Sequence, residues 1–166
     1  MVLEISEVVW YTINMFKQKP FLFSLLVLVV LISLHSVGSY FFWYWTYPWF
    51  DILVHTVSGL WAGSVMLWLA SCLGQMDSLN RYKIKSFFIA VISAILIGIL
   101  WELLEYFSQI TSTSADNYGW HTAKDILSDT FGGILAHLYF VKRKKSADKA
   151  SDVLHPFYNQ TGIIKN

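Results

Sequence analysis

The sequence predicts an all-α membrane protein, a four-transmembrane-helix bundle with a short N-terminal interfacial helix. Of its 166 residues, 55% are hydrophobic and only 14% are charged, whereas soluble domains average about 25% charged residues. Four apolar stretches are each long enough to cross a bilayer, which takes about 20 helical residues. The lysines and arginines fall in alternate connections between these stretches, as expected of a chain that crosses the membrane repeatedly.

The N-terminal lead, residues 1–19, mixes apolar and polar side chains without a long apolar run. This pattern favours a short amphipathic helix that lies in the membrane interface. A secretory signal peptide is the alternative, but the lead contains Glu4 and Glu7, and no small-residue cleavage site follows it. We therefore expect an interfacial helix.

Four spans follow, interrupted by polar loops. We expect them at residues 21–42, 51–73, 86–108 and 122–141. The segment 40–50 is very rich in tryptophan, tyrosine and phenylalanine, which is typical of an interfacial turn. Glycines in the spans allow close approach of helices, so we expect helix contacts at Gly59, Gly63, Gly98, Gly132 and Gly133.

Basic residues set the orientation, because lysine and arginine mark the cytoplasmic side. They precede the first span, lie between the second and third spans, and follow the fourth at Lys142–Lys145. We therefore expect a multi-pass protein of the plasma (inner) membrane with both termini cytoplasmic. The transmembrane domain covers 20–145, and 146–166 is a polar cytoplasmic tail.

Ionisable residues occur at one end of each of the last three spans. Asp51 and His55 open the second span, and Glu102 and Glu105 lie near the end of the third. The fourth opens with His121, Asp125 and Asp129. Spacings of three and four residues place such side chains on one face of a helix, and the predicted topology brings all three groups to the outer side. Ionisable residues at membrane depth are costly, so this convergence indicates a functional site.

Five carboxylates with few cations nearby favour a bound divalent metal ion, zinc, manganese, iron or magnesium. The predicted ligands are His55, Glu102, Glu105, Asp125 and Asp129. Asp51 or His121 would then serve as the general base. Two alternatives stay open: the acids form an ion or proton relay, or they hold the helices together through hydrogen bonds.

The same residues carry a family resemblance over the last three spans. The pattern of Asp51, His55 and Gly59, then Glu102 and Glu105, then Trp120, Lys124, Asp125 and Gly132-Gly133 looks like that of the YjdF-type bacterial inner-membrane family. The segment 125–133 also resembles the end of VanZ-like proteins. This resemblance implies a small multi-pass protein. Because VanZ-like members are linked to resistance to a glycopeptide antibiotic, it also implies chemistry of the cell envelope.

The leading hypothesis is a metal-dependent hydrolase or transferase that acts on a membrane lipid or a lipid-linked substrate. The G-x-S-x-G, P-loop and H-E-x-x-H signatures are absent. The single cysteine, Cys72, excludes an internal disulfide. Since membrane topology explains the basic clusters, we expect no nucleic-acid partner.

Overall fold

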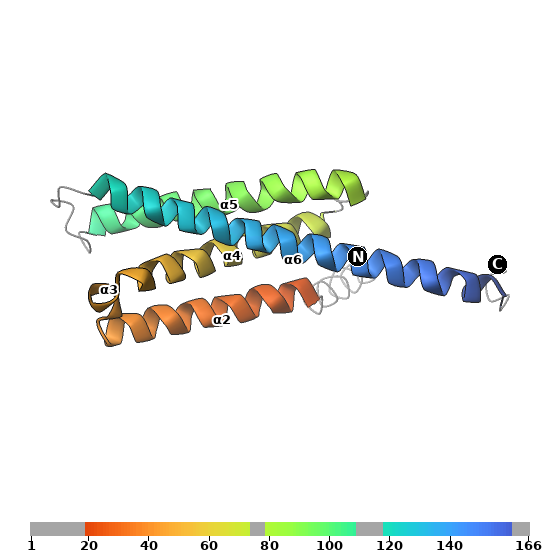
Figure 1. Ribbon diagram of the computed structural model, residues 1–166, viewed down its shortest axis with the longest axis horizontal. Coiled ribbons are helices and arrows are strands. Elements are labelled where there is room, and N and C mark those ends of the chain that lie inside the picture. Colours follow the sequence, from red (N-terminus) through yellow and green to blue (C-terminus); the bar gives the residue numbers. More distant parts are fainter. Residues whose placement is uncertain (1–18, 74–78, 109–117, 161–166) are drawn as a thin grey trace, which may run out of the picture.

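The computed structural model describes residues 19–73, 79–108 and 118–160, and these ranges consist of helices joined by short turns. The predicted all-helical class is confirmed. The helices are α2 (Lys19–Tyr40), α3 (Trp43–Thr46), α4 (Pro48–Cys72), α5 (Leu79–Ser108) and α6 (Tyr118–Gln160) (Figure 1). The interfacial helix expected over the N-terminal lead lies outside the described residues, apart from Lys19 at the start of α2.

Three of these helices are long and apolar enough to cross a membrane: α2, α4 and the part of α5 from Lys83 to Ser108. They are 22, 25 and 26 residues long, which agrees with the first three predicted spans. The predicted fourth span falls in α6, where Lys124, Asp125 and Asp129 make the helix more polar. The structure thus describes a multi-pass helical protein with at least three candidate spans.

Helix α6 extends well beyond the predicted fourth span. It continues as one helix through the basic cluster and through most of the predicted tail, as far as Gln160. Its C-terminal part projects past the ends of the other helices (Figure 1). The sequence of 146–166 predicts a polar cytoplasmic tail, and its composition does not predict this helix.

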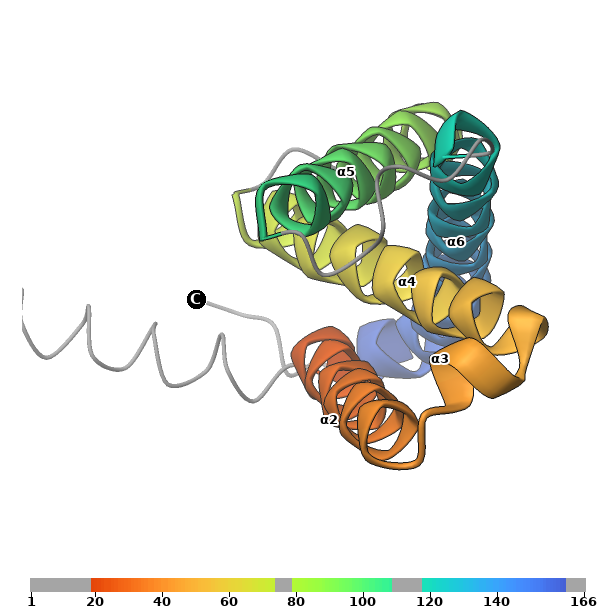
Figure 2. The same ribbon diagram turned by 90° about the vertical axis from the view of Figure 1, so that its left-hand side faces the viewer.

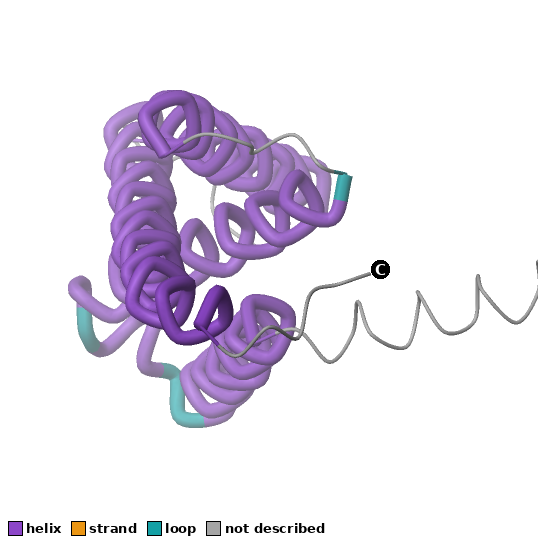
Figure 3. Tube along the Cα trace, turned by 90° about the vertical axis from the view of Figure 1, so that its right-hand side faces the viewer, coloured by secondary structure: helices purple, strands orange, loops and turns teal. Residues whose placement is uncertain are grey.

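Helices α4, α5 and α6 pack against one another, while α2 packs along α4 (Figure 2). The view from the opposite end shows the same grouping of long helices (Figure 3). The end of α2, all of α3, the start of α4, the end of α5 and the start of α6 lie together (Figure 1). We call this region the α3 end of the bundle.

Glycines permit the close contacts between the three core helices. A Cβ atom on Gly59 of α4 would overlap the backbone carbonyl of Asp129 in α6, and one on Gly132 would overlap that of Thr56. A Cβ on Gly63 would stand 2.9 Å from the Cβ of Ala136. Gly98 and Gly133 are equally confined. The prediction that these five glycines lie at helix contacts is confirmed.

Side chains on the outside of the bundle are largely apolar. Leu26, Leu96 and Leu138 are more than half exposed, and they belong to α2, α5 and α6. Exposed apolar surface on this scale is unfavourable in water, but it suits helices whose outer faces contact lipid. The distribution agrees with a membrane protein.

A tight aromatic turn closes the α3 end. Phe42 has a left-handed backbone, with φ of 58°, and Pro48 occupies the first turn of α4, where its missing N–H is tolerated. Phe50 is only 1% exposed and packs against Trp43 and Tyr44. The turn therefore holds the start of α4, and Asp51 with it, in a defined position.

Candidate functional site

The polar residues predicted from the three spans meet at the α3 end. Asp51 lies in the first turn of α4, and His55 follows one turn later. Glu102 comes from the end of α5, while Asp125 and Asp129 come from the start of α6. Four of these side chains, His55, Glu102, Asp125 and Asp129, are at most 7% exposed. The fold thus buries charged groups between helices, as the sequence pattern indicated.

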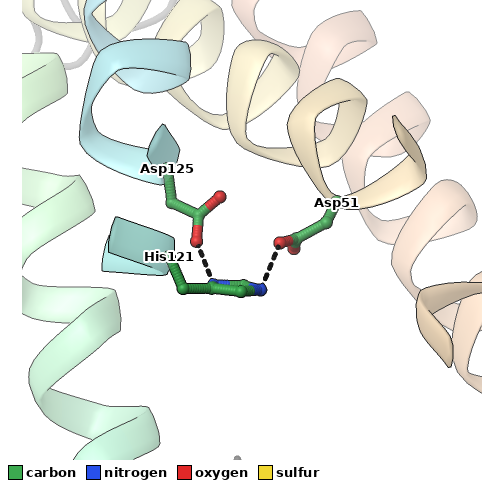
Figure 4. A group of neighbouring side chains, drawn as sticks. All are labelled: Asp51, His121 and Asp125. Atoms are coloured by element: carbon green, nitrogen blue, oxygen red, sulfur yellow. Dashed lines mark ion pairs between the residues drawn. The ribbon is translucent and has the colours of Figure 1, made fainter. Parts of the chain in front are cut away.

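Carboxylates and imidazoles alternate through this cluster. His121 Nδ1 lies 2.6 Å from Asp125 Oδ2, and His121 Nε2 lies 3.5 Å from Asp51 Oδ2 (Figure 4). On its other side, Asp51 Oδ1 lies 3.7 Å from His55 Nε2. His55 Nδ1 in turn lies 2.9 Å from Asp129 Oδ2. We call the five residues Asp125, His121, Asp51, His55 and Asp129 the carboxylate–imidazole chain.

Lys124 places a cationic group next to the carboxylate–imidazole chain. Its Nζ lies 3.6 Å from both Asp51 Oδ2 and Asp125 Oδ1. Three aspartates against one lysine leave a deficit of two positive charges. Two protonated imidazoles or one divalent cation would supply them, so the charge balance is compatible with either a proton-carrying or a metal-holding cluster.

Glu102 is held by Thr122, which is not among the predicted site residues. The hydroxyl of Thr122 donates a 2.7 Å hydrogen bond to Glu102 Oε2, which joins α5 to α6. Thr122 precedes Asp125 by three residues and Asp129 by seven, spacings that share one helical face. This periodicity is the sequence signal that places Thr122 on the same face as the two aspartates. Threonine is not ionisable, so the rule that ionisable residues in the membrane indicate functional sites does not identify it.

Glu105 is placed differently from the other predicted ligands. Its Oε1 accepts a 2.8 Å hydrogen bond from Trp101 Nε1, one turn earlier on α5. Glu105 belongs to neither of the two groups of potential metal ligands found among the described residues. The structure therefore places Glu102 in one of the ligand groups and gives Glu105 a hydrogen bond to Trp101; the prediction that Glu105 is also a ligand stays a prediction.

Two groups of side chains could each hold a metal ion. One consists of Asp51, His121 and Asp125, and the other of His55, Glu102 and Asp125. Within each group the ligand atoms lie within 4.8 Å of one another. Ligand atoms stand about 3.4 Å apart around a tetrahedral zinc ion, and about 4.2 Å apart on opposite sides of an octahedral magnesium ion. An inward movement of the side chains would therefore close either group.

Asp125 is common to both groups, and its carboxylate is almost fully buried, with 1% exposure. Neither of its oxygens accepts a hydrogen bond from a described residue, although His121 Nδ1 lies 2.6 Å from Oδ2 and Lys124 Nζ lies 3.6 Å from Oδ1. Asp51 Oδ2 is in the same situation. Buried carboxylate oxygens are normally satisfied, so this arrangement indicates room for a cation or for protons.

The surroundings of Asp129 leave no space for a larger neighbour. A Cβ atom on Gly98 would overlap Asp129 Oδ2, and one on Gly59 would overlap the Asp129 backbone. Two glycines on two helices thus permit the approach of α6 that brings Asp129 to His55. Small residues at these two positions are part of how the site is assembled.

Tyr44 and His35 lie beside the cluster at the aromatic turn. Burial raises the pKa of the Tyr44 phenol above its ordinary value, and the charges of Asp51 and Glu105 act in the same direction. The phenol therefore stays protonated, and its hydroxyl can donate the 2.9 Å hydrogen bond to His35 Nδ1. His35 was not among the predicted site residues.

Comparison with known proteins places the chain in a family whose description states only that it is a membrane protein. No curated protein and no solved structure matches the chain. One family model, described as "Predicted membrane protein (DUF2238)", matches residues 3–146. This range includes every residue of the cluster. The chain belongs to the DUF2238 family of predicted membrane proteins.

Proposed function

We propose that the protein is a metal-dependent membrane enzyme that acts at the outer leaflet on a lipid or a lipid-linked intermediate of the cell envelope. The position of Asp125 carries this proposal, because the residue belongs to both ligand groups and has two buried oxygens that accept no hydrogen bond from a described residue. A carboxylate of this kind can bridge two divalent cations. Paired cations about 3.5–4 Å apart stabilise the attacking and leaving oxygens of phosphoryl transfer.

The proposal includes α6 as a fourth span, with both termini in the cytoplasm. Asp125 and Asp129 are buried against the neighbouring helices, while Leu127, Phe131 and Leu138 are more than half exposed on the outer face of α6. A helix that hides its charges inside the bundle can cross a bilayer despite its polar composition. The basic residues between the second and third spans, and those that follow the fourth span at Lys142–Lys145, agree with this topology.

The residues of the carboxylate–imidazole chain and Glu102 have different roles in the proposed chemistry. Asp125 and Glu102 would supply carboxylate ligands, and His55 an imidazole ligand oriented by Asp129 through the 2.9 Å contact. His121 is 48% exposed and contacts Asp51, so it can take a proton from water and pass it outward. Bound cations would polarise the phosphoryl or carbonyl oxygen of the substrate.

The envelope substrate is the part of the proposal that depends on sequence resemblance. The YjdF-like and VanZ-like patterns around Asp51, Glu102 and Asp125 suggest an inner-membrane protein with a role in envelope chemistry. The match to the DUF2238 family supports membrane location at the coarser level. The YjdF-type or VanZ-like assignment stays a prediction.

A proton relay is the second candidate function, and the carboxylate–imidazole chain favours it. The carboxylate–imidazole chain is exposed at His121, which is half-exposed, and ends at Asp129, which is fully buried. Imidazole can pass protons between its two nitrogens. A conductor also needs a polar route to the other end of the bundle. Beyond Asp129, however, Gly63 approaches Ala90 and Ala136 directly. The polar groups further along are mainly the hydroxyls of Ser64, Ser86 and Ser93 and the imidazole of His137, which make only a thin polar path. This packing favours a chain that ends at a catalytic site.

Elemental analysis of the purified, full-length protein tests the metal proposal. We expect a bound divalent metal, and we expect Asp125→Asn to lower its content because the substitution removes a shared ligand and a charge. Ser128→Ala, which changes another buried polar residue on α6, should leave the metal content unchanged. A metal-free protein that is indifferent to chelators would overturn the proposal. Proton flux into proteoliposomes that His55→Gln abolishes would establish the relay in its place.

A further inference from the structure

A cavity of about 210 Å³ lies between α2, α4 and α5, and its lining includes His55, the residue that contacts Asp129 of α6. Leu31 and Ile32 of α2 form one wall, and Trp101 of α5 forms another. Val54 and His55 of α4 form the floor, with exposures of 9% and 5%. The cavity therefore reaches from the outer surface of the bundle to a residue of the candidate metal site.

The rim of the cavity is exposed at a surface that faces lipid. Ile32 is 56% exposed and Trp101 is 40% exposed, and both belong to helices long and apolar enough to cross a membrane. Hydrocarbon surrounds the outer faces of such helices. A hydrocarbon chain is thus the group that can enter without giving up any hydration.

The size and chemistry of the cavity suit part of a lipid chain. An apolar cavity of roughly 150 Å³ accommodates benzene, so this one has room for a short segment of an alkyl or isoprenoid chain. Three polar side chains, His35, His55 and Ser58, interrupt the apolar wall. A mainly apolar pocket with a few polar groups is the usual form of a site that binds and orients a ligand.

His55 connects this cavity to the carboxylate cluster. It lines the cavity, contacts Asp51 and Asp129, and belongs to one of the two ligand groups. We propose that the cavity binds the hydrocarbon chain of a membrane lipid and thereby presents the lipid headgroup to His55 and the cluster. This inference rests on the proposed function, since it states that the protein binds its lipid substrate by the hydrocarbon chain.

Photo-crosslinking tests the inference. The probe is phosphatidylglycerol with a diazirine in one acyl chain, added to the full-length protein in nanodiscs. We expect adducts on the cavity residues of α2 and α4, and a several-fold lower yield there for Ile32→Trp, whose indole fills the cavity from its rim. Val54→Phe should act in the same way from the floor.

Leu26→Trp is the matched control, because Leu26 lies on α2 with an exposure of 61% and is not part of the cavity wall. It should leave the yield at the cavity unchanged. Adducts spread evenly along α2, or an undiminished yield for both filling variants, would overturn the inference and indicate general lipid contact only.

Metal content separates this inference from the proposed function. Ile32→Trp should keep the metal while it loses the lipid adducts, and Asp125→Asn should lose the metal while it keeps them. A metal-containing protein without cavity adducts would contradict the lipid inference alone. A metal-free protein with specific adducts would contradict the metal proposal and leave a lipid-binding cavity.

Discussion

His55 Nδ1 lies 2.9 Å from Asp129 Oδ2, and this contact joins α4 to α6 with both side chains almost fully buried. Loss of one partner would leave the other polar group buried and uncompensated, which costs about 3–5 kcal/mol for a buried pair. We therefore expect His55→Gln to lower the thermal unfolding temperature markedly. Thermal denaturation of the purified protein in detergent measures the effect.

The same substitution at His121 is the control for this prediction. His121 also contacts two aspartates, but its side chain is 48% exposed, and exposed ion pairs contribute only about 0–1 kcal/mol. His121→Gln should therefore have a small effect on stability. Equal losses for the two variants would show that the His55–Asp129 contact is not a buried structural pair.

Two glutamates one turn apart on α5 are expected to differ in metal binding. Glu102 is 7% exposed and belongs to a ligand group, whereas Glu105 bonds to Trp101 on its own helix. Glu102→Gln should therefore reduce the metal content and Glu105→Gln should not, although each removes one negative charge. Elemental analysis of both proteins, purified side by side, provides the comparison. If the two variants lose equal amounts of metal, the assignment of Glu102 is wrong.

This pair of glutamates also shows how far the sequence could predict the site. Spacing predicted that Asp51 shares a face with His55, and His121 with Asp125, because residues four apart are neighbours on any helix. Topology then predicted that the three groups meet at one end. Which atoms pair between helices depends on how each helix is rotated about its own axis. Three residues correspond to about 300° of rotation, so Glu102 and Glu105 point about 60° apart.

The same limit explains the other differences between prediction and structure. The first half of α6 is predicted as a span, but the helix continues to Gln160 through a polar segment that carries no apolar signal. Thr122 became a partner of Glu102 because two helices cross at that point. The apolar cavity required the relative positions of three helices, which no periodicity within one helix contains.

The close contact of α4 and α6 predicts a strong effect of a single methyl group. A Cβ atom at Gly59 would overlap the backbone of Asp129, so Gly59→Ala must push the helices apart. Such overpacking typically costs about 1–3 kcal/mol, and here it would also lengthen the His55–Asp129 contact. We expect a lower thermal unfolding temperature together with a lower metal content.

Gly119 provides the matched comparison on α6. A Cβ at this position would have no heavy atom within 4 Å, and alanine is the better helix former by up to about 1 kcal/mol. Gly119→Ala should therefore leave stability unchanged or raise it slightly. A neutral Gly59→Ala variant would mean that the two helices are not as tightly packed as described.

The last prediction concerns the topology, on which the outer-leaflet location of the site depends. In a Cys72→Ser background, single cysteines are placed at Asn117 and at Lys145, one before and one after the predicted fourth span, 122–141. If α6 crosses the membrane with its basic end inside, a membrane-impermeant maleimide added to intact cells should label Asn117→Cys and not Lys145→Cys. Both positions should react after the cells are opened, which shows that each thiol is accessible in principle.

The buried position of Asp125 and Asp129 makes this crossing feasible, since their charges face α4 and α5 and not lipid. Labelling of both cysteines from the same side would mean that α6 does not cross the membrane. Labelling of Lys145→Cys alone in intact cells would place the cluster on the cytoplasmic side and exclude an outer-leaflet substrate.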